Sequence, residues 1–146
     1  MEIAVGDCHG REIILSPDVW KELLDHRCAI LAYFRRDDEA RDPPPPPMSI
    51  AHLTLRYSTI NNLKILRFET QDMRLSLSTS TILGLFNFEY CINRIVGTLL
   101  PLTAHVDAKL YRFKNIAASA SVNAIRDSEY FDRDDLLDCE LLALFI

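Results

Sequence analysis

Apolar and polar residues alternate over two short segments near the start of the chain and then change to a helical period. Glu2–Val5 and Glu12–Leu15 are predicted strands joined by a turn. Ser16 is suited to cap a helix and Pro17 to begin one, because the first helical position needs no N–H donor. The next apolar residues recur every three or four positions: Val19, Trp20, Leu23, Leu24, Cys28 and Leu31. The pattern predicts a reduced strand–strand–helix unit over residues 1–34.

A longer stretch of alternation follows, starting at His52. Along His52–Ser58, residues Leu53, Leu55 and Tyr57 share one face, and Thr54, Arg56 and Ser58 share the other. Asn61-Asn62 supplies a turn before the strand Leu63–Phe68, and Met73–Leu77 alternates in the same way. These segments predict several neighbouring antiparallel strands.

Ser78 is placed to cap the helix that follows these strands. This helix should extend to about Thr98, because Gly97 and Pro101 bound it. Residues 48–100 are therefore predicted to form a unit of four strands and one helix.

The two units share a pattern at an offset of 62 residues. Ile3, Ile13, Leu15, Ser16, Trp20, Leu23, Leu24 and Ile30 correspond to Ile65, Leu75, Leu77, Ser78, Ile82, Leu85, Phe86 and Ile92. Either a duplication or a chance match of two common patterns accounts for this. The predicted fold class is α+β, with antiparallel curved sheets, one long helix per unit, and two strand–strand–helix units in tandem.

Three further segments complete the predicted organisation. Residues 35–47 are charged and then run through five prolines, which lack an N–H and favour a stiff spacer. Residues 101–126 are expected to hold a strand, Val106–Lys114, and a small-residue segment. Residues 127–146 form an acidic C-terminal segment with interspersed leucines, which predicts either an amphipathic helix packed on the core or a mobile acidic tail.

Charge is distributed unevenly along the chain. The 146 residues are 49% hydrophobic and 25% charged, as in ordinary globular proteins, and the net charge is −5. Residues 1–47 carry −4, residues 48–126 carry +5 and residues 127–146 carry −6. A basic middle between two acidic ends indicates a polyanion-binding surface with its own internal competitor.

The cysteine, histidine and other potentially reactive residues form no recognisable catalytic or metal-binding motif. The four cysteines and four histidines lack the short spacings of zinc or redox sites, and no phosphate-binding loop or nucleophile elbow is present. No apolar stretch is long enough to cross a bilayer, and the first ten residues do not read as a signal peptide. We therefore expect a non-enzymatic intracellular protein with reduced thiols, without cofactor, metal or membrane association.

The segment Gly10–Leu23, which reads GREIILSPDVWKEL, resembles the positive cofactor four family of transcriptional coactivators. That resemblance implies a curved four-stranded antiparallel sheet followed by a helix, dimer formation and binding of single-stranded DNA. His52–Ile95 is similar to the same layout, although it has Ser78-Thr79-Ser80-Thr81-Ile82 in place of the family's phrase. The family's usual lysines around the first strands are sparse in this chain.

The candidate contacts combine cations for phosphates with rings for base stacking. On the predicted sheet they are Arg56, Lys64, Arg67 and Arg74, with Tyr57 and Phe68 as either stacking platforms or core. In the interleaved segment they are Lys109, Tyr111, Arg112, Phe113 and Lys114, which an amphipathic edge strand explains equally well.

The leading hypothesis is a single-stranded DNA- or RNA-binding protein, dimeric or oligomeric, acting in transcription, replication or genome packaging. The expected site of action is the nucleus, or a virion or host nucleus if the chain is viral. The alternative is a structural or adaptor protein that oligomerises or binds a protein partner through its C-terminal amphipathic helix.

Overall fold

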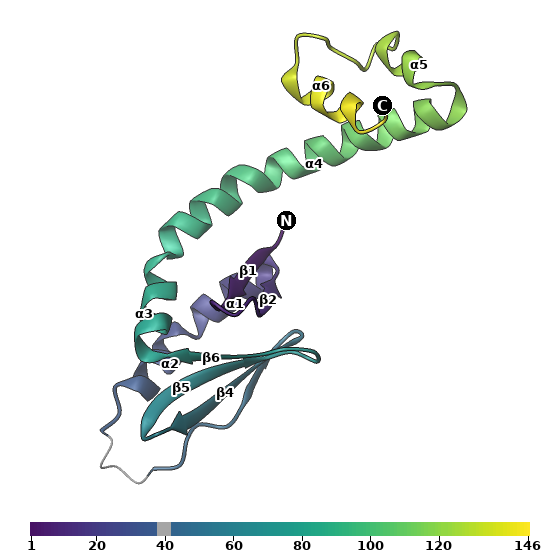
Figure 1. Ribbon diagram of the computed structural model, residues 1–146. Helices are drawn as coiled ribbons and strands as arrows, with labels where there is room; N and C mark the ends of the chain where they lie inside the picture. Colours follow the sequence, from purple (N-terminus) through teal and green to yellow (C-terminus); the bar gives the residue numbers. More distant parts are fainter. Residues whose placement is uncertain (38–41) are drawn as a thin grey trace. The chain divides into compact units, whose positions relative to one another are not determined.

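The computed structural model describes residues 1–37 and 42–146, and its fold is α+β (Figure 1). The described chain forms a two-stranded and a four-stranded antiparallel sheet and one long helix. It divides into two compact units, unit 1 over Met1–Val96 and unit 2 over Gly97–Ile146. The predicted α+β class with antiparallel sheets is confirmed.

Unit 1 contains both sheets and the helices that follow them. Its elements are β1 (Ile3–Gly6), β2 (Glu12–Leu15), α1 (Pro17–Asp25), α2 (Arg27–Phe34), β3 (Met48–Ile50), β4 (Leu53–Ile60), β5 (Leu63–Glu69), β6 (Arg74–Ser78), α3 (Thr79–Asn87) and the first part of α4 (Glu89–Ser119). The described residues of the predicted linker 35–47 form no helix or strand, and residues 38–41 lie outside the described chain.

Both predicted serine caps are present. Ser16 Oγ accepts a hydrogen bond from the Val19 N–H, and Ser78 Oγ accepts one from the Thr81 N–H. Each cap is followed by a helix of nine residues that ends at a single non-helical position, His26 or Phe88. The sequence predicted one continuous helix after each serine. The structure has two helices in each place, α1 and α2 after Ser16 and α3 and α4 after Ser78.

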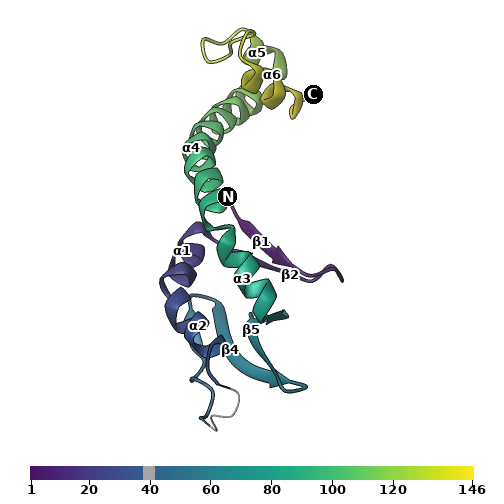
Figure 2. The ribbon, with the colours of Figure 1, turned by 90° about the vertical axis from the view of Figure 1, so that its left-hand side faces the viewer.

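The four-stranded sheet is a meander in the order β3-β4-β5-β6. The turn predicted between β4 and β5 is confirmed: Asn61 and Asn62 have φ of 50° and 63°, a left-handed conformation that asparagine tolerates better than most residues. Alternation then directs every second side chain of each strand to the face covered by helices, and leaves the other face without a helix from unit 1 (Figures 1 and 2).

The core of unit 1 lies between the strands and helices α1 to α3. Its fully buried side chains are Ile13, Leu15, Trp20, Leu23, Ile30, Ile50, Leu53, Leu55, Leu66, Phe68, Leu75 and Ile82. The indole N–H of Trp20 donates to Asn93 Oδ1 at 3.1 Å, which satisfies the one polar group of that side chain. Arg27, which begins α2, forms an ion pair with Glu89, which begins α4.

The hairpin β1–β2 and the hairpin β5–β6 have the same register relative to their serine caps. Ile3 pairs with Leu15 and Val5 with Ile13, just as Leu66 pairs with Leu77 and Phe68 with Leu75. Five residues connect the first pair of strands and four connect the second. The counterpart of Ile3 in register is therefore Leu66, one residue beyond the Ile65 given by the constant offset of 62.

Unit 2 is helical, and the strand predicted over 106–114 is wrong. This segment belongs to α4, which passes through Pro101 and continues to Ser119. Val106, Leu110 and Phe113 follow one another at intervals of four and three, a helical spacing, and all contact the core of unit 2. Pro101 leaves the Gly97 carbonyl without its usual helical donor, but both residues are exposed, so water can hydrate that carbonyl.

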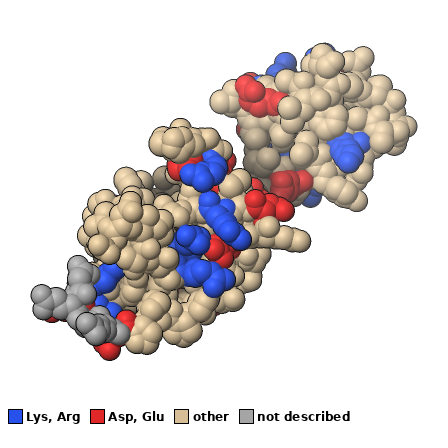
Figure 3. All heavy atoms as spheres, turned by 60° about the horizontal axis from the view of Figure 1, so that its bottom comes forward, with Lys and Arg blue, Asp and Glu red and all other residues tan. Residues whose placement is uncertain are grey.

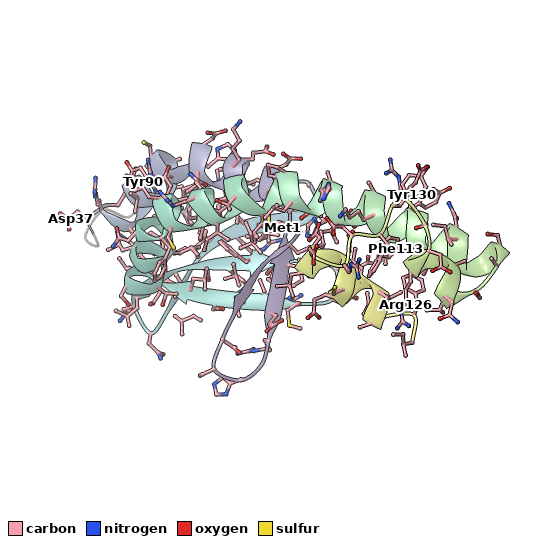
Figure 4. All side chains as sticks on the ribbon, turned by 90° about the horizontal axis from the view of Figure 1, so that it is seen from above. Met1, Asp37, Tyr90, Phe113, Arg126 and Tyr130 are labelled. Carbon is pink, nitrogen blue, oxygen red and sulfur yellow. The ribbon has the colours of Figure 1, made fainter. Side chains whose placement is uncertain are left out.

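Two short helices close the core of unit 2. They are α5 (Val122–Arg126) and α6 (Leu136–Ala143). Phe113 of α4, which is labelled in Figure 4, is fully buried together with Ile125, and Leu141 and Leu142 of α6 pack against them. Of the two predicted states for the C-terminal segment, the structure shows the packed one.

Candidate nucleic-acid interface

Three of the predicted cations lie together on the face of the four-stranded sheet that no helix of unit 1 covers. Arg56 on β4 and Arg67 on β5 are direct cross-strand partners, and Arg74 on β6 is paired in register with Glu69 of β5. The alternation that buries Leu55 and Tyr57 points Arg56 to this face. We call Arg56, Arg67, Glu69 and Arg74 the arginine face.

Glu69 is enclosed by these three arginines. Its carboxylate lies 3.1 Å from Arg56 Nε, 3.6 Å from Arg67 Nη1 and 4.0 Å from Arg74 Nε. Desolvation acts to raise the pKa of Glu69, but the hydrogen bond from Arg56 and the charges of the three arginines together lower it below its ordinary value. Glu69 is therefore ionised at neutral pH, and the arginine face keeps a net charge of two positive units.

The arginines remain accessible to a ligand although they share this carboxylate. The exposed fractions of their side chains are 47% for Arg56, 28% for Arg67 and 77% for Arg74, whereas that of Glu69 is 15%. Five donors on each guanidinium exceed what one carboxylate accepts. The space-filling view shows Lys and Arg side chains gathered in one group with an acidic side chain among them (Figure 3).

Hydroxyl groups extend this face along the same strands. Thr54 and Ser58 flank Arg56 on β4, and Ser76 is the cross-strand partner of Arg67 on β6. Alternation puts all three on the side of the arginines. Neutral hydroxyl donors beside guanidinium groups suit an anionic oxygen ligand.

Lys64 does not belong to the arginine face. It is the partner of Thr59 near the end of β5, and by alternation it lies on the helix side of the sheet. Its ammonium donates to the Arg36 carbonyl and lies 5.8 Å from the centre of the Tyr33 ring. This lysine contributes to the packing of α2 on the sheet.

The two predicted aromatic platforms are core residues. Tyr57 is 6% exposed and Phe68 is fully buried, so neither presents a ring to a base. Tyr57 packs against Tyr33 with ring centres 4.7 Å apart, and Tyr33 Oη donates to the Ser58 carbonyl. The arginine face therefore carries cations and hydroxyl groups, and any stacking on it would use guanidinium planes.

The interleaved segment of unit 2 does not form the predicted alternating strand surface. Phe113 is fully buried, so its assignment as a stacking residue is wrong. Lys109 Nζ lies 2.5 Å from Asp138 Oδ1 and 2.9 Å from Asp135 Oδ2, so two acids of the C-terminal segment occupy this cation. Tyr111, Arg112 and Lys114 are exposed, and the Arg112 guanidinium lies 5.0 Å from the centre of the Tyr130 ring.

The lysine–aspartate contact in unit 2 is a buried polar cluster. The side chain of Asp138 is 1% exposed and also accepts the Asp132 N–H at 2.9 Å. The hydrogen bond that Lys109 donates to Asp138 is the main cause that raises the pKa of Lys109. The hydrogen bond from Lys109 is the main cause that lowers the pKa of Asp135. The acidic segment thus neutralises a predicted site residue within its own unit.

Glu69 is the site residue that the sequence prediction omitted. It stands two residues after Arg67, so strand alternation alone places both on one face. The same rule, applied to acids as well as bases, would have found it.

Potential metal ligands do not cluster in the part of the chain that the structure describes. No group of three or more His, Cys, Asp or Glu side chains there could hold a metal ion, and the four cysteines are exposed free thiols. None of the helices in residues 1–37 and 42–146 has both the length and the apolar character needed to span a bilayer. Comparisons with protein-family models, with curated proteins and with solved structures find no match to this chain.

Proposed function

We propose that this protein binds single-stranded nucleic acid through the arginine face. The observation that carries the proposal is the cross-strand pair Arg56–Arg67, with Arg74 beside it and a single carboxylate among the three. Like charges directly opposite one another on a sheet are unfavourable, and the one carboxylate of Glu69 offsets only part of the charge of three arginines, which favours an anionic ligand. Guanidinium groups bind phosphate in a bidentate manner and also stack on bases, which unpaired strands expose.

A titration of fluorescent oligo-dT, followed by anisotropy at two salt concentrations, tests this function. Three phosphate contacts to a single strand predict that log K falls with log salt at a slope of about −2. A hairpin duplex of equal charge should bind more weakly, because its bases are already stacked. Binding that is absent at low salt, or that does not change with salt, would refute the proposal.

Glu69→Gln is expected to strengthen binding to oligo-dT by about three- to tenfold at low salt. The variant keeps the shape of the side chain and removes the negative charge that competes with phosphate for the arginines. Its salt slope should stay close to about −2, because the same three arginines make the phosphate contacts. Glu22→Gln on α1 makes the same charge change at an exposed position, and an equal gain for that variant would show that only net charge matters.

The adaptor hypothesis requires the apolar side of α6 to be available to a partner. Leu141 and Leu142 are each 6% exposed and pack against Phe113 within unit 2. A partner that used these leucines would have to displace this contact.

We also propose that unit 1 contains two copies of one strand–strand–helix plan. The matched hairpin registers, the two serine caps and the two nine-residue helices support this. The ion pair between Arg27 and Glu89 joins corresponding positions of the two copies, as expected close to a local two-fold axis. The second copy has β3 and β4 in addition, and the first has no counterpart of them.

A further inference from the structure

The outer edge of β1 carries unpaired backbone groups. Among residues 1–37 and 42–146, β1 pairs only with β2, in a sheet of two strands. The Asp7 N–H donates to the Arg11 carbonyl, and hydrogen-bonded and non-hydrogen-bonded pairs alternate along an antiparallel ladder. The pair Ala4–Ile14 is therefore non-hydrogen-bonded, and the peptide groups of Ala4 point away from β2. The contact of His52 Nε2 with the Ile14 carbonyl, at 3.1 Å, is consistent with this pattern, because it shows that this carbonyl points away from β1.

The second copy of the plan shows what covers the corresponding edge. There, β4 pairs along the whole outer edge of β5, the counterpart of β1. Tyr57 of β4 also packs on Tyr33 of α2, which becomes 5% exposed. The residue of α4 that corresponds to Tyr33 is Ile95, and it is 50% exposed. The first copy thus lacks both a strand on β1 and an apolar side chain on Ile95.

β1 also lacks the features that usually protect an edge strand. Charged residues, prolines and bulges discourage pairing at an edge, and Ile3–Gly6 reads IAVG, with none of these. By contrast, β3 at the far edge of the larger sheet is three residues long and follows five prolines. An unprotected apolar edge is a ready template for another strand.

From this geometry we infer that the occupant of this edge is β1 of a second copy of the chain, an inference that rests on the duplication proposed above. An antiparallel pair centred on Ala4 places Ala4 opposite Ala4 of the partner, and Ile3 opposite the partner's Val5. The facing residues carry no like charges, so the strand is complementary to itself. The partner's Val5 then takes the place that Tyr57 occupies in the second copy, over Ile95. Pairing makes one four-stranded sheet in the order β2-β1-β1-β2.

Ala4→Pro tests the pairing directly. Proline removes the outward N–H of Ala4 and is tolerated at strand edges, so the hairpin with β2 should persist. We expect sedimentation velocity of the full chain without nucleic acid to show a dimer, and Ala4→Pro to raise its dissociation constant by about tenfold or more. Ala4→Val keeps the N–H, favours a strand and should leave the dimer intact. A monomeric wild-type chain at tens of micromolar, or a dimer that Ala4→Pro does not weaken, would overturn the inference.

Ile95→Gln provides a second variant that does not alter β1. Ile95 is half exposed in the single chain, so the substitution should leave the fold of unit 1 unchanged, as judged by the fluorescence of the buried Trp20. It should also weaken the dimer, because the partner's Val5 would lose its apolar contact. If Ala4→Pro proves unfolded, an undiminished dimer in Ile95→Gln refutes the inference. Neither residue lies on the arginine face, so loss of the dimer with retained oligo-dT binding separates this inference from the proposed function.

Discussion

The double substitution Arg56→Ala with Arg67→Ala is expected to weaken oligo-dT binding by about 30-fold at moderate salt. These two residues form the cross-strand pair at the centre of the arginine face. Their removal deletes two phosphate contacts, so the salt slope should fall in magnitude by about 1.4. Glu69 would also keep only Arg74 as a neutralising partner, which leaves a nearly uncharged face. Fluorescence anisotropy at several salt concentrations measures both effects.

A matched control separates this site from general charge. Lys21→Ala with Arg126→Ala also removes two positive charges, at exposed positions on α1 and α5. We expect this control to change affinity by less than about threefold, because neither side chain belongs to the arginine face. Equal losses in the two double variants would mean that the arginine face is not the binding surface. Circular dichroism of all variants should match the wild type, since the substituted side chains lie outside the core.

The strands and caps were predictable from the sequence because local chemistry determines them. Alternation located β4 and β5, and a serine before a run of apolar residues located both helix starts. The breaks at His26 and Phe88 were not predictable, because neither position has a proline or glycine that would signal one. The helical state of 106–114 was missed because charged and aromatic residues interleave there as in a strand. The apolar side of this segment is buried by α5 and α6, which lie further along the sequence.

The candidate site was partly predictable for the same reason. Arg56, Arg67 and Arg74 lie on one face because of strand alternation, which the sequence displays. The partner of Lys109 could not be predicted, because Asp138 lies 29 residues further along the chain and reaches it only through the turn between α5 and α6. The burial of Tyr57 could not be predicted either, because it depends on a contact with Tyr33 of α2, which is distant in sequence.

Lys109→Met is expected to destabilise unit 2 by about 3 kcal/mol. Asp138 has a 1% exposed side chain, and without Lys109 its charge would remain buried with only the Asp132 N–H as a donor. Hydrogen exchange of peptides from α5 and α6 should accelerate, while Trp20 fluorescence, which reports on unit 1, should show no change. Lys114→Met is the matched control, because Lys114 is exposed on the same helix. Equal effects of the two substitutions would assign no special role to the lysine–aspartate cluster.

The same cluster predicts how the stability of unit 2 depends on pH. Asp135 has a lowered pKa, so its contribution is present above its ordinary value of 3.8 and is lost as the pH falls through the lower folded pKa. Lys109 has a raised pKa, so its contribution is complete below its ordinary value of 10.5 and is lost as the pH rises through the higher folded pKa. The protection of the α6 amides, which is their exchange rate relative to the intrinsic rate at the same pH, should therefore be greatest between these limits in the wild type. In Lys109→Met the alkaline loss should disappear and the acid loss should shrink, because both arise from the contact that this variant removes. An unchanged profile in the variant would show that other groups control the stability of this unit.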